Sequence, residues 1–379
     1  MDGTLDFIPV NEPLLDGNEK KYLEECVETG WISSEGSFVR KFEDKMSSYV
    51  DRKHGVSVTN GTAALEIAVR AIGIEEGDEV IMPTLTIISC ANAVIKAGAK
   101  PVFVDCDINT FNMIPSDIEK KITLKTKAIM IVHLYGLPVL VDEIMKIANK
   151  YNLKVIEDAA EMHGQTYFGR PCGSFGDVSI FSFYPNKIIT TGEGGMIVSD
   201  DDEIAERCRE LRNLSFKKDN RYIHDEISGN CRFTNLQAAV GLAQLERIDE
   251  HIKKKRYIGK YYTEKLNGIK GLTLPIEKTD YAENIYWVYS LVIDEDVELD
   301  NRKIQKILSN RGIGTRTFFW CMHEQPVLKR MEIADDDKYA NAEFLARKGF
   351  YIPSGLAVTN EQMNRVSDVL WSIMEEIQN

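Results

Sequence analysis

The sequence predicts an α/β fold in which helices flank a mostly parallel central sheet, followed by a smaller α+β C-terminal lobe. Between residues 55 and 200, short apolar runs alternate with amphipathic stretches, a pattern typical of parallel strands joined by helical crossovers. A long helical pattern then spans 234–266, and fewer strand patterns follow it. The 379 residues, 44% hydrophobic and 28% charged, suit one large folded subunit with two lobes.

The strands of the large lobe are predicted at short apolar runs that end in turn residues or carboxylates. In chain order these runs are 54–59, 78–83, 100–105, 127–136, 153–158, 177–184 and 194–199. Two intervening stretches, 61–74 and 141–152, place apolar residues at helical spacing. The large lobe therefore consists of alternating strands and helices.

The C-terminal third begins with a long helix that links the two lobes. Thr234 is its predicted N-cap, because a threonine hydroxyl can accept a bond from the first free N–H groups of a helix. Strand patterns at 286–294 and 312–319 and a last helical pattern at 361–378 follow. We expect a large cofactor-binding domain over 1–250 and a small α+β domain over 251–379.

Composition excludes several functional classes. The chain has 46 Lys and Arg against 59 Asp and Glu, a net charge of −13, which argues against general binding of nucleic acid or anionic membranes. We find neither a signal-peptide pattern nor an apolar run long enough to span a membrane, so a cytoplasmic location is expected. The seven cysteines form no CxxC pair and the six histidines no HExxH motif, so no metal site is expected.

The first candidate binding site follows the strand at 54–59. There Asn60, Gly61, Thr62 and Ala63 open a helix, and free N–H groups at a helix N-terminus bind anions such as phosphate. Ordinary capping of the helix is the alternative interpretation and, for this motif alone, the favoured one.

Two further candidates follow other strands. Asp158 ends the apolar run at 153–158, and Lys187 follows the run at 177–184, just before a glycine-rich segment. Separately, Asp158 could cap a helix and Lys187 could be a solvated surface charge. Together with the anion site they supply the three groups that pyridoxal phosphate requires: N–H groups for the phosphate, a carboxylate for the ring nitrogen and an amine for the aldehyde.

With these motifs in view, the sequence resembles the fold-type-I aminotransferases of the DegT/DnrJ/EryC1/StrS family over nearly its whole length. The matching segments are 30–36 (GWISSEG), 59–65 (TNGTAAL), 77–86 (GDEVIMPTLT), 156–164 (IEDAAEMHG), 175–198 (FGDVSIFSFYPNKIITTGEGGMIV) and 229–249 (GNCRFTNLQAAVGLAQLERID). The segment around Lys187 is the longest and most specific.

For the cofactor, the resemblance implies that Lys187 holds pyridoxal 5'-phosphate as the internal aldimine and that Asp158 pairs with the pyridinium nitrogen. It implies a phosphate site made by Gly61, Thr62, Ala63 and Ser182. Asn230 would reach the phosphate of the neighbouring subunit, so the active sites of a homodimer would be shared.

The resemblance also implies contacts around the ring and the substrate. Glu161 matches the position near the phenolic oxygen of the cofactor. Ile87 stands where the family usually presents an aromatic ring, so we expect aliphatic packing on that face of the pyridine. His323, Phe319 and Arg316 would lie near the sugar nucleotide.

The reaction implied is a transamination in which L-glutamate leaves its amino group on the cofactor as pyridoxamine phosphate, and a nucleotide-linked 4-keto-6-deoxy sugar then receives it. Lys187 would act as the base at the glutamate Cα and as the acid at C4′ of the cofactor.

Segments 157–161, 181–196 and 315–326 are most similar to members that use GDP-4-keto-6-deoxymannose and serve lipopolysaccharide O-antigen synthesis. A UDP- or dTDP-linked sugar is the alternative. Related sugar dehydratases carry His at the lysine position, and a non-catalytic pyridoxal-phosphate-binding protein would not need both Lys187 and Asp158.

Overall fold

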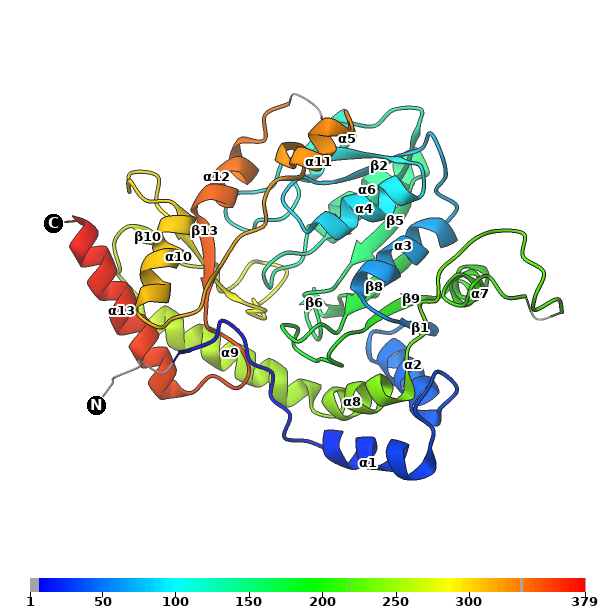
Figure 1. Cartoon of the computed structure of the whole chain (residues 1–379). Coiled ribbons are helices and arrows are strands. Elements are labelled where there is room, and N and C mark those ends of the chain that lie inside the picture. The colour runs from blue at the N-terminus through cyan, green and yellow to red at the C-terminus, as the bar shows by residue number, and fades with distance from the viewer. Residues whose placement is uncertain (1–6, 218, 335–336, 379) are drawn as a thin grey trace.

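The computed structural model describes residues 7–217, 219–334 and 337–378, which form a large and a small lobe (Figure 1). The strands are β1 (His54–Val58), β2 (Glu79–Pro83), β3 (Lys100–Val104), β4 (Thr126–Val132), β5 (Lys154–Asp158), β6 (Thr166–Tyr167), β7 (Arg170–Pro171), β8 (Val178–Ser182), β9 (Gly195–Ser199), β10 (Leu272–Thr273), β11 (Tyr289–Ile293), β12 (Arg316–Thr317) and β13 (Gly349–Ile352). The helices are α1 (Glu19–Thr29), α2 (Ser37–Tyr49), α3 (Gly61–Ala71), α4 (Ile88–Lys96), α5 (Pro115–Lys120), α6 (Val141–Tyr151), α7 (Asp202–Leu211), α8 (Asn235–Leu245), α9 (Ile248–Lys265), α10 (Asn301–Asn310), the 3₁₀ turn η1 (Met322–Glu324), α11 (Pro326–Arg330), α12 (Ala340–Lys348) and α13 (Asn360–Gln378).

The large lobe is built on a seven-stranded sheet in the order β1-β9-β8-β5-β4-β2-β3. The strands from β8 to β3 pair in parallel, whereas β9 runs antiparallel to both β8 and β1. The connection between β8 and β9 (183–194) contains no helix and returns the chain antiparallel, whereas the parallel neighbours need crossovers, which are α4 between β2 and β3, α6 between β4 and β5, and the β6–β7 segment between β5 and β8. All seven predicted runs form these strands, so the predicted α/β class with a mostly parallel sheet is confirmed.

Strand register brings the predicted site to one edge of this sheet. Asp158, the last residue of β5, lies beside Val132 of β4 and Ile180 of β8, and Ser182 ends β8. The carboxyl ends of parallel strands meet at a common edge, where open α/β sheets bind their ligands.

The predicted helix over 234–266 consists of two helices, α8 and α9, which follow each other along the lower side of the molecule and connect the lobes (Figure 1). Thr234 is the N-cap as predicted: its hydroxyl accepts a bond from the N–H of Gln237, whose side chain bonds back to Thr234 in a capping box. In the ranges that the structure describes, no helix is both long and apolar enough to cross a bilayer.

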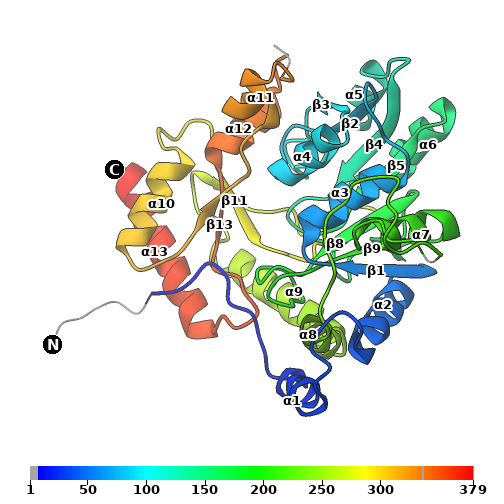
Figure 2. The same ribbon diagram turned by 45° about the vertical axis from the view of Figure 1, so that its right-hand side comes forward.

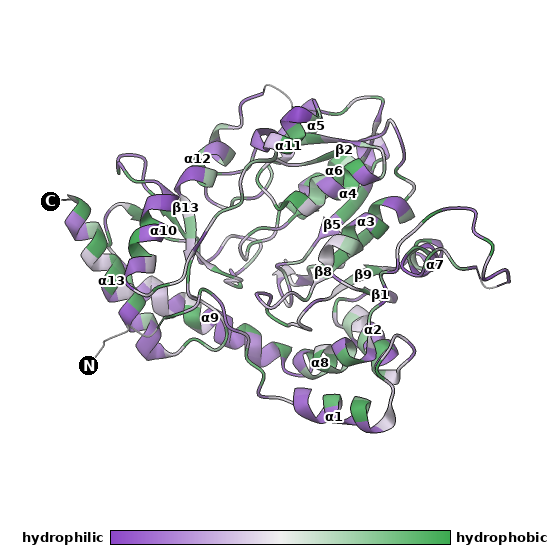
Figure 3. Ribbon diagram, in the orientation of Figure 1, coloured by the Kyte–Doolittle hydropathy of each residue, from purple (hydrophilic) through white to green (hydrophobic). Residues whose placement is uncertain are grey.

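Two hydrophobic clusters fill the interior. One packs the helices of the large lobe around its sheet, where β8, α3 and α4 are rich in apolar residues (Figure 3). The other lies in the small lobe, between the antiparallel sheet β10-β11-β13-β12 and the helices α9, α10 and α13 (Figure 2).

The N-terminal segment belongs to the small lobe by its contacts. Ile8 is buried in the second cluster and forms a parallel bridge with Ile313. The Asn11 side chain then donates a hydrogen bond of 2.8 Å to the carbonyl of Pro185, two residues before Lys187. The segment from Phe7 to α1 therefore contacts the small lobe at Ile8 and the loop that carries Lys187 at Asn11.

Candidate active site

A cavity of about 720 Å³ opens at the carboxyl edge of the large sheet. It is lined by the loops that follow β1, β2, β4, β5 and β8, and by residues that enter from the small-lobe side. Nine of the residues predicted for the site share this cavity: Gly61, Thr62, Ala63, Ile87, Asp158, Glu161, Ser182, Lys187 and Phe319.

One end of the cavity is the N-terminus of α3. The Asn60 side chain caps this helix by accepting a 2.8 Å hydrogen bond from the N–H of Ala63, so the capping interpretation is correct for that N–H group. The N–H groups of Gly61 and Thr62 lie in the first turn, where no earlier carbonyl can pair with them. A Cβ on Gly61 would lie 2.8 Å from the Ser182 Cβ, so glycine lets the serine reach the helix N-terminus. This arrangement fits a phosphate group.

Asp158 lies deeper in the cavity, at the end of β5. It is buried, and its Oδ1 accepts a 3.0 Å hydrogen bond from the N–H of Ala160. Burial raises the pKa of Asp158, and this shift is opposed by the Ala160 N–H, the Cys90 thiol and the charge of Lys187. A buried carboxylate in this setting favours a cationic partner such as a pyridinium nitrogen.

Lys187 lies in the loop between β8 and β9, and its Nζ is 4.1 Å from the centroid of the Trp287 ring. The Trp287 indole N–H donates a 2.8 Å hydrogen bond to the carbonyl of Asn186, which fixes the loop next to the lysine. Burial lowers the pKa of Lys187, while the charges of Glu161 and Asp158 act in the opposite direction. An amine with a lowered pKa is more often neutral and hence more nucleophilic.

Glu161 is the third ionisable group of the cavity. It is buried, and its Oε2 accepts a 2.7 Å hydrogen bond from the N–H of Tyr135. Burial raises the pKa of Glu161 to about 8, with Asp158 adding to the shift and Lys187 and the Tyr135 N–H opposing it. Burial therefore favours the protonated form of this carboxyl group, while a charged Lys187 favours the ionised form.

An aromatic cluster, made by Tyr135, Trp287 and Phe319, lies at the cavity, which Trp287 and Phe319 line directly. The Tyr135 ring stacks on Trp287 with centroids 6.1 Å apart and on Phe319 at 5.7 Å, and its hydroxyl accepts a 3.0 Å hydrogen bond from the Phe319 N–H. Of these three residues, only Phe319 was predicted for the site. Trp287 and Tyr135 belong to no motif, and neither the strand pattern at 286–294 nor the run at 127–136 signals that they meet.

The other three predicted residues do not line the cavity. Asn230 is exposed and forms a backbone bridge with Asn213, and Arg316 is exposed on β12. His323 is buried, with its Nδ1 2.7 Å from the Thr84 hydroxyl. In this conformation of the described chain, none of the three faces the cofactor-binding groups.

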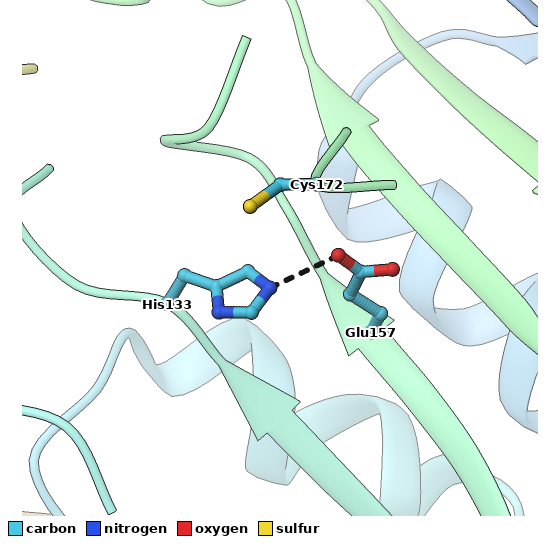
Figure 4. Close-up of side chains that lie close together, drawn as sticks. All are labelled: His133, Glu157 and Cys172. Carbon is cyan, nitrogen blue, oxygen red and sulfur yellow. Dashed lines mark hydrogen bonds and ion pairs between the residues drawn. The ribbon is translucent and has the colours of Figure 1, made fainter. Parts of the chain in front are cut away.

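A buried cluster behind β5 combines His133, Glu157 and Cys172, whose potential ligand atoms lie within 4.8 Å of one another (Figure 4). The His133 Nδ1 accepts a bond from the Val139 N–H, so its Nε2 carries the proton and donates to Glu157 at 3.0 Å. Glu157 also accepts bonds from two backbone N–H groups and from the Ser179 hydroxyl, and burial raises the pKa of the Cys172 thiol. The donors and acceptors of His133 and Glu157 are already used within the protein, so we interpret the cluster as support for β5.

Comparison with known proteins agrees with this geometry. The family model described as the DegT/DnrJ/EryC1/StrS aminotransferase family matches residues 13–371. The chain is 43% identical over 360 residues to GDP-perosamine synthase of Escherichia coli O157:H7, covering 94% of this chain and 96% of that one. It is 42% identical over 367 residues to GDP-perosamine synthase of Caulobacter vibrioides, covering 97% and 98%. The crystal structure of S. venezuelae DesV in complex with a ketimine intermediate matches with a TM-score of 0.87 and 31% identity, covering 94% of both chains.

Proposed function

The chain belongs to the DegT/DnrJ/EryC1/StrS aminotransferase family, and from this membership and the geometry of its cavity we propose that it transfers the amino group of L-glutamate to GDP-4-keto-6-deoxymannose, giving GDP-perosamine. The observation that carries the proposal is a single cavity that contains an amine, a buried carboxylate and a helix N-terminus. We assign the product to surface polysaccharide of the lipopolysaccharide O-antigen type.

The cavity residues fit pyridoxal phosphate. The first-turn N–H groups of α3, with the Thr62 and Ser182 hydroxyls, would hold the phosphate, and Asp158 would hold the proton on the ring nitrogen. Lys187 would carry the covalent attachment, and Ile87, which is 43% exposed, would pack on one face of the ring. When bound, the cofactor supplies an electron sink for the carbanion that transamination forms.

Proton transfer is assigned to Lys187. Once the donor amine has displaced it, its Nζ would take the proton from the Cα of glutamate and return it at C4′ of the cofactor. The Trp287 ring beside Nζ limits the positions that the amine can adopt.

A test of the chemistry uses the purified protein with pyridoxal phosphate. Borohydride should fix the cofactor to Lys187, and peptide mapping should find it there. Lys187→Ala should lose both the covalent link and turnover while its circular dichroism spectrum stays unchanged. Full transamination by Lys187→Ala would show that another amine is the base.

The nucleotide sugar is tested by supplying glutamate with each of three 4-keto-6-deoxy sugars, linked to GDP, UDP or dTDP. Amination of the GDP sugar supports the proposal, and amination of only the UDP or dTDP sugar would favour the alternative. A dehydratase would give a sugar that has lost a hydroxyl group as water and carries no amino group. Analysis of the sugar product for a new amine therefore separates the two reaction classes.

We further propose a homodimer with shared sites, in which Asn230 serves the partner's phosphate. Its exposed position outside its own cavity supports this assignment. Mixing Lys187→Ala with Asn230→Ala subunits should restore activity, because one site of the mixed dimer then combines an intact Lys187 with an intact Asn230. Without sharing, no mixed dimer would hold both residues in one site, and activity would stay low.

A further inference from the structure

A thiol lies behind the carboxylate that faces the cavity. Cys90 is on α4, is fully buried, and its Sγ is 3.3 Å from the Oδ2 of Asp158. The Thr86 hydroxyl is 3.6 Å from the same sulfur. Cys90 does not line the cavity, so it contacts the site through Asp158 and Thr86, which do.

The direction of this hydrogen bond follows from the chemistry of the two groups. Burial raises the pKa of the Cys90 thiol well above its usual range, and the charge of Asp158 adds to the shift. The sulfur therefore keeps its proton at neutral pH, and an ionised carboxylate can only accept. With Cys90 donating to Asp158, the hydroxyl of Thr86 is free to donate to the sulfur.

Asp158 is thus held at both oxygens. The Ala160 N–H donates to Oδ1 at 3.0 Å and the Cys90 thiol donates to Oδ2, each from a different element. Two bonds of this kind fix the rotation of the carboxylate plane, which sets the direction of its remaining lone pairs. They also stabilise the ionised form against the cost of burial.

We propose that Cys90 is a positioning residue, whose S–H bond fixes the orientation of Asp158 toward the ring nitrogen of the cofactor. This inference rests on the proposed function for the identity of the ring. Cys90 touches neither the cofactor nor the substrate, and it acts only through the carboxylate.

The contact itself is tested in the cofactor-free protein by infrared spectroscopy of S–H stretching. The Cys90 band is identified as the one that Cys90→Ser removes. A hydrogen-bonded thiol absorbs at lower frequency, so this band should shift upward in Asp158→Ala, with Asp158→Asn as a second variant should the alanine protein not fold. A band at the same frequency in both Asp158 variants would overturn the proposal.

The effect on the site is tested by a pair of variants of nearly equal size. Cys90→Ala removes the donor, whereas Cys90→Ser keeps one. We expect Cys90→Ala to bind pyridoxal phosphate about tenfold more weakly than Cys90→Ser, which is the effect of one hydrogen bond to a charged group, as measured by titration of cofactor-free protein. Equal dissociation constants in the two variants would mean that the cysteine only fills space.

A failure of the proposed role of Cys90 can be distinguished from a failure of the proposed function. The infrared measurement needs no cofactor, so it reports on the thiol even if the wild-type protein fails to bind pyridoxal phosphate. Such a failure would refute the proposed function, while an upward shift of the band would still establish the hydrogen bond.

Discussion

The buried acid Glu161 gives the sharpest quantitative prediction. Burial raises its pKa from 4.5 to about 8, so in the cofactor-free protein it stays protonated over a pH range in which the unfolded chain ionises. Glu161→Gln keeps the shape of the neutral acid and removes the titration. The substitution therefore isolates the contribution of this one group.

The direction in which the stability changes with pH follows from the number of protons bound in each state. Between pH 4.5 and about 8 the native state binds more protons at this position than the unfolded state, so wild-type stability falls as the pH rises, by about 1.4 kcal/mol per pH unit. From about pH 5 to about pH 7.5 the wild-type protein should lose about 3 kcal/mol relative to Glu161→Gln. This loss of stability is absent below the pKa that Glu161 has in the unfolded chain, and it is complete above the pKa that Glu161 has in the folded protein.

The assay is urea unfolding of both cofactor-free proteins at equal concentration and at several pH values in this range. The free energies of unfolding should converge toward pH 5 and diverge in favour of Glu161→Gln toward pH 7.5. Parallel curves would refute the reasoning, since they would mean that Glu161 ionises normally in the folded protein.

Three other substitutions have expected outcomes. Asp158→Asn should lower kcat about a hundredfold in steady-state assays, because a neutral amide does not hold the pyridinium proton; activity near that of the wild type would argue against this role. Gly61→Ala should weaken cofactor binding about tenfold in titrations, because its Cβ would lie 2.8 Å from that of Ser182, and unchanged affinity would show that the serine can move at little cost. Burial lowers the pKa of Lys255 to about 7, so the charged amine destabilises the fold most below that pH. Lys255→Met should raise the free energy of unfolding by about 3 kcal/mol near pH 6, with a gain that shrinks as the pH rises toward 10, and a gain independent of pH would contradict this account.

The large sheet and the centre of the site could be predicted from the sequence because local patterns encode them. The carboxyl ends of parallel strands lie at one edge of the sheet. Asp158, Lys187 and Gly61, which follow such strands, could therefore be placed near one another without knowledge of tertiary contacts. The resemblance supplied Glu161 and Ile87, which line the same cavity. Their chemical roles stay predictions until they are measured.

The positions of the other site residues depend on contacts between segments that are distant in the sequence. Tyr135 lies in a turn with a φ of +53°, and Trp287 lies in the segment that leads into β11. No local sequence pattern predicts that either residue belongs to the site. His323 was expected near the sugar nucleotide from the resemblance, whereas its ring is buried and its partner Thr84 is 239 residues away in the sequence. Cys90 gave no signal because a single cysteine in a helical pattern is indistinguishable from a core residue.

The loop that carries Lys187 is attached to two other parts of the chain, and this attachment has a mechanical consequence. Asn11, from the segment that begins in the small lobe, bonds to Pro185, and Trp287, at the start of the small-lobe sheet, bonds to Asn186. The loop is thus tethered on the small-lobe side by two successive residues immediately before Lys187. Movement of the segment at Asn11 or of Trp287 would shift the backbone next to Lys187, so the position of the reacting amine is coupled to the packing of these two residues.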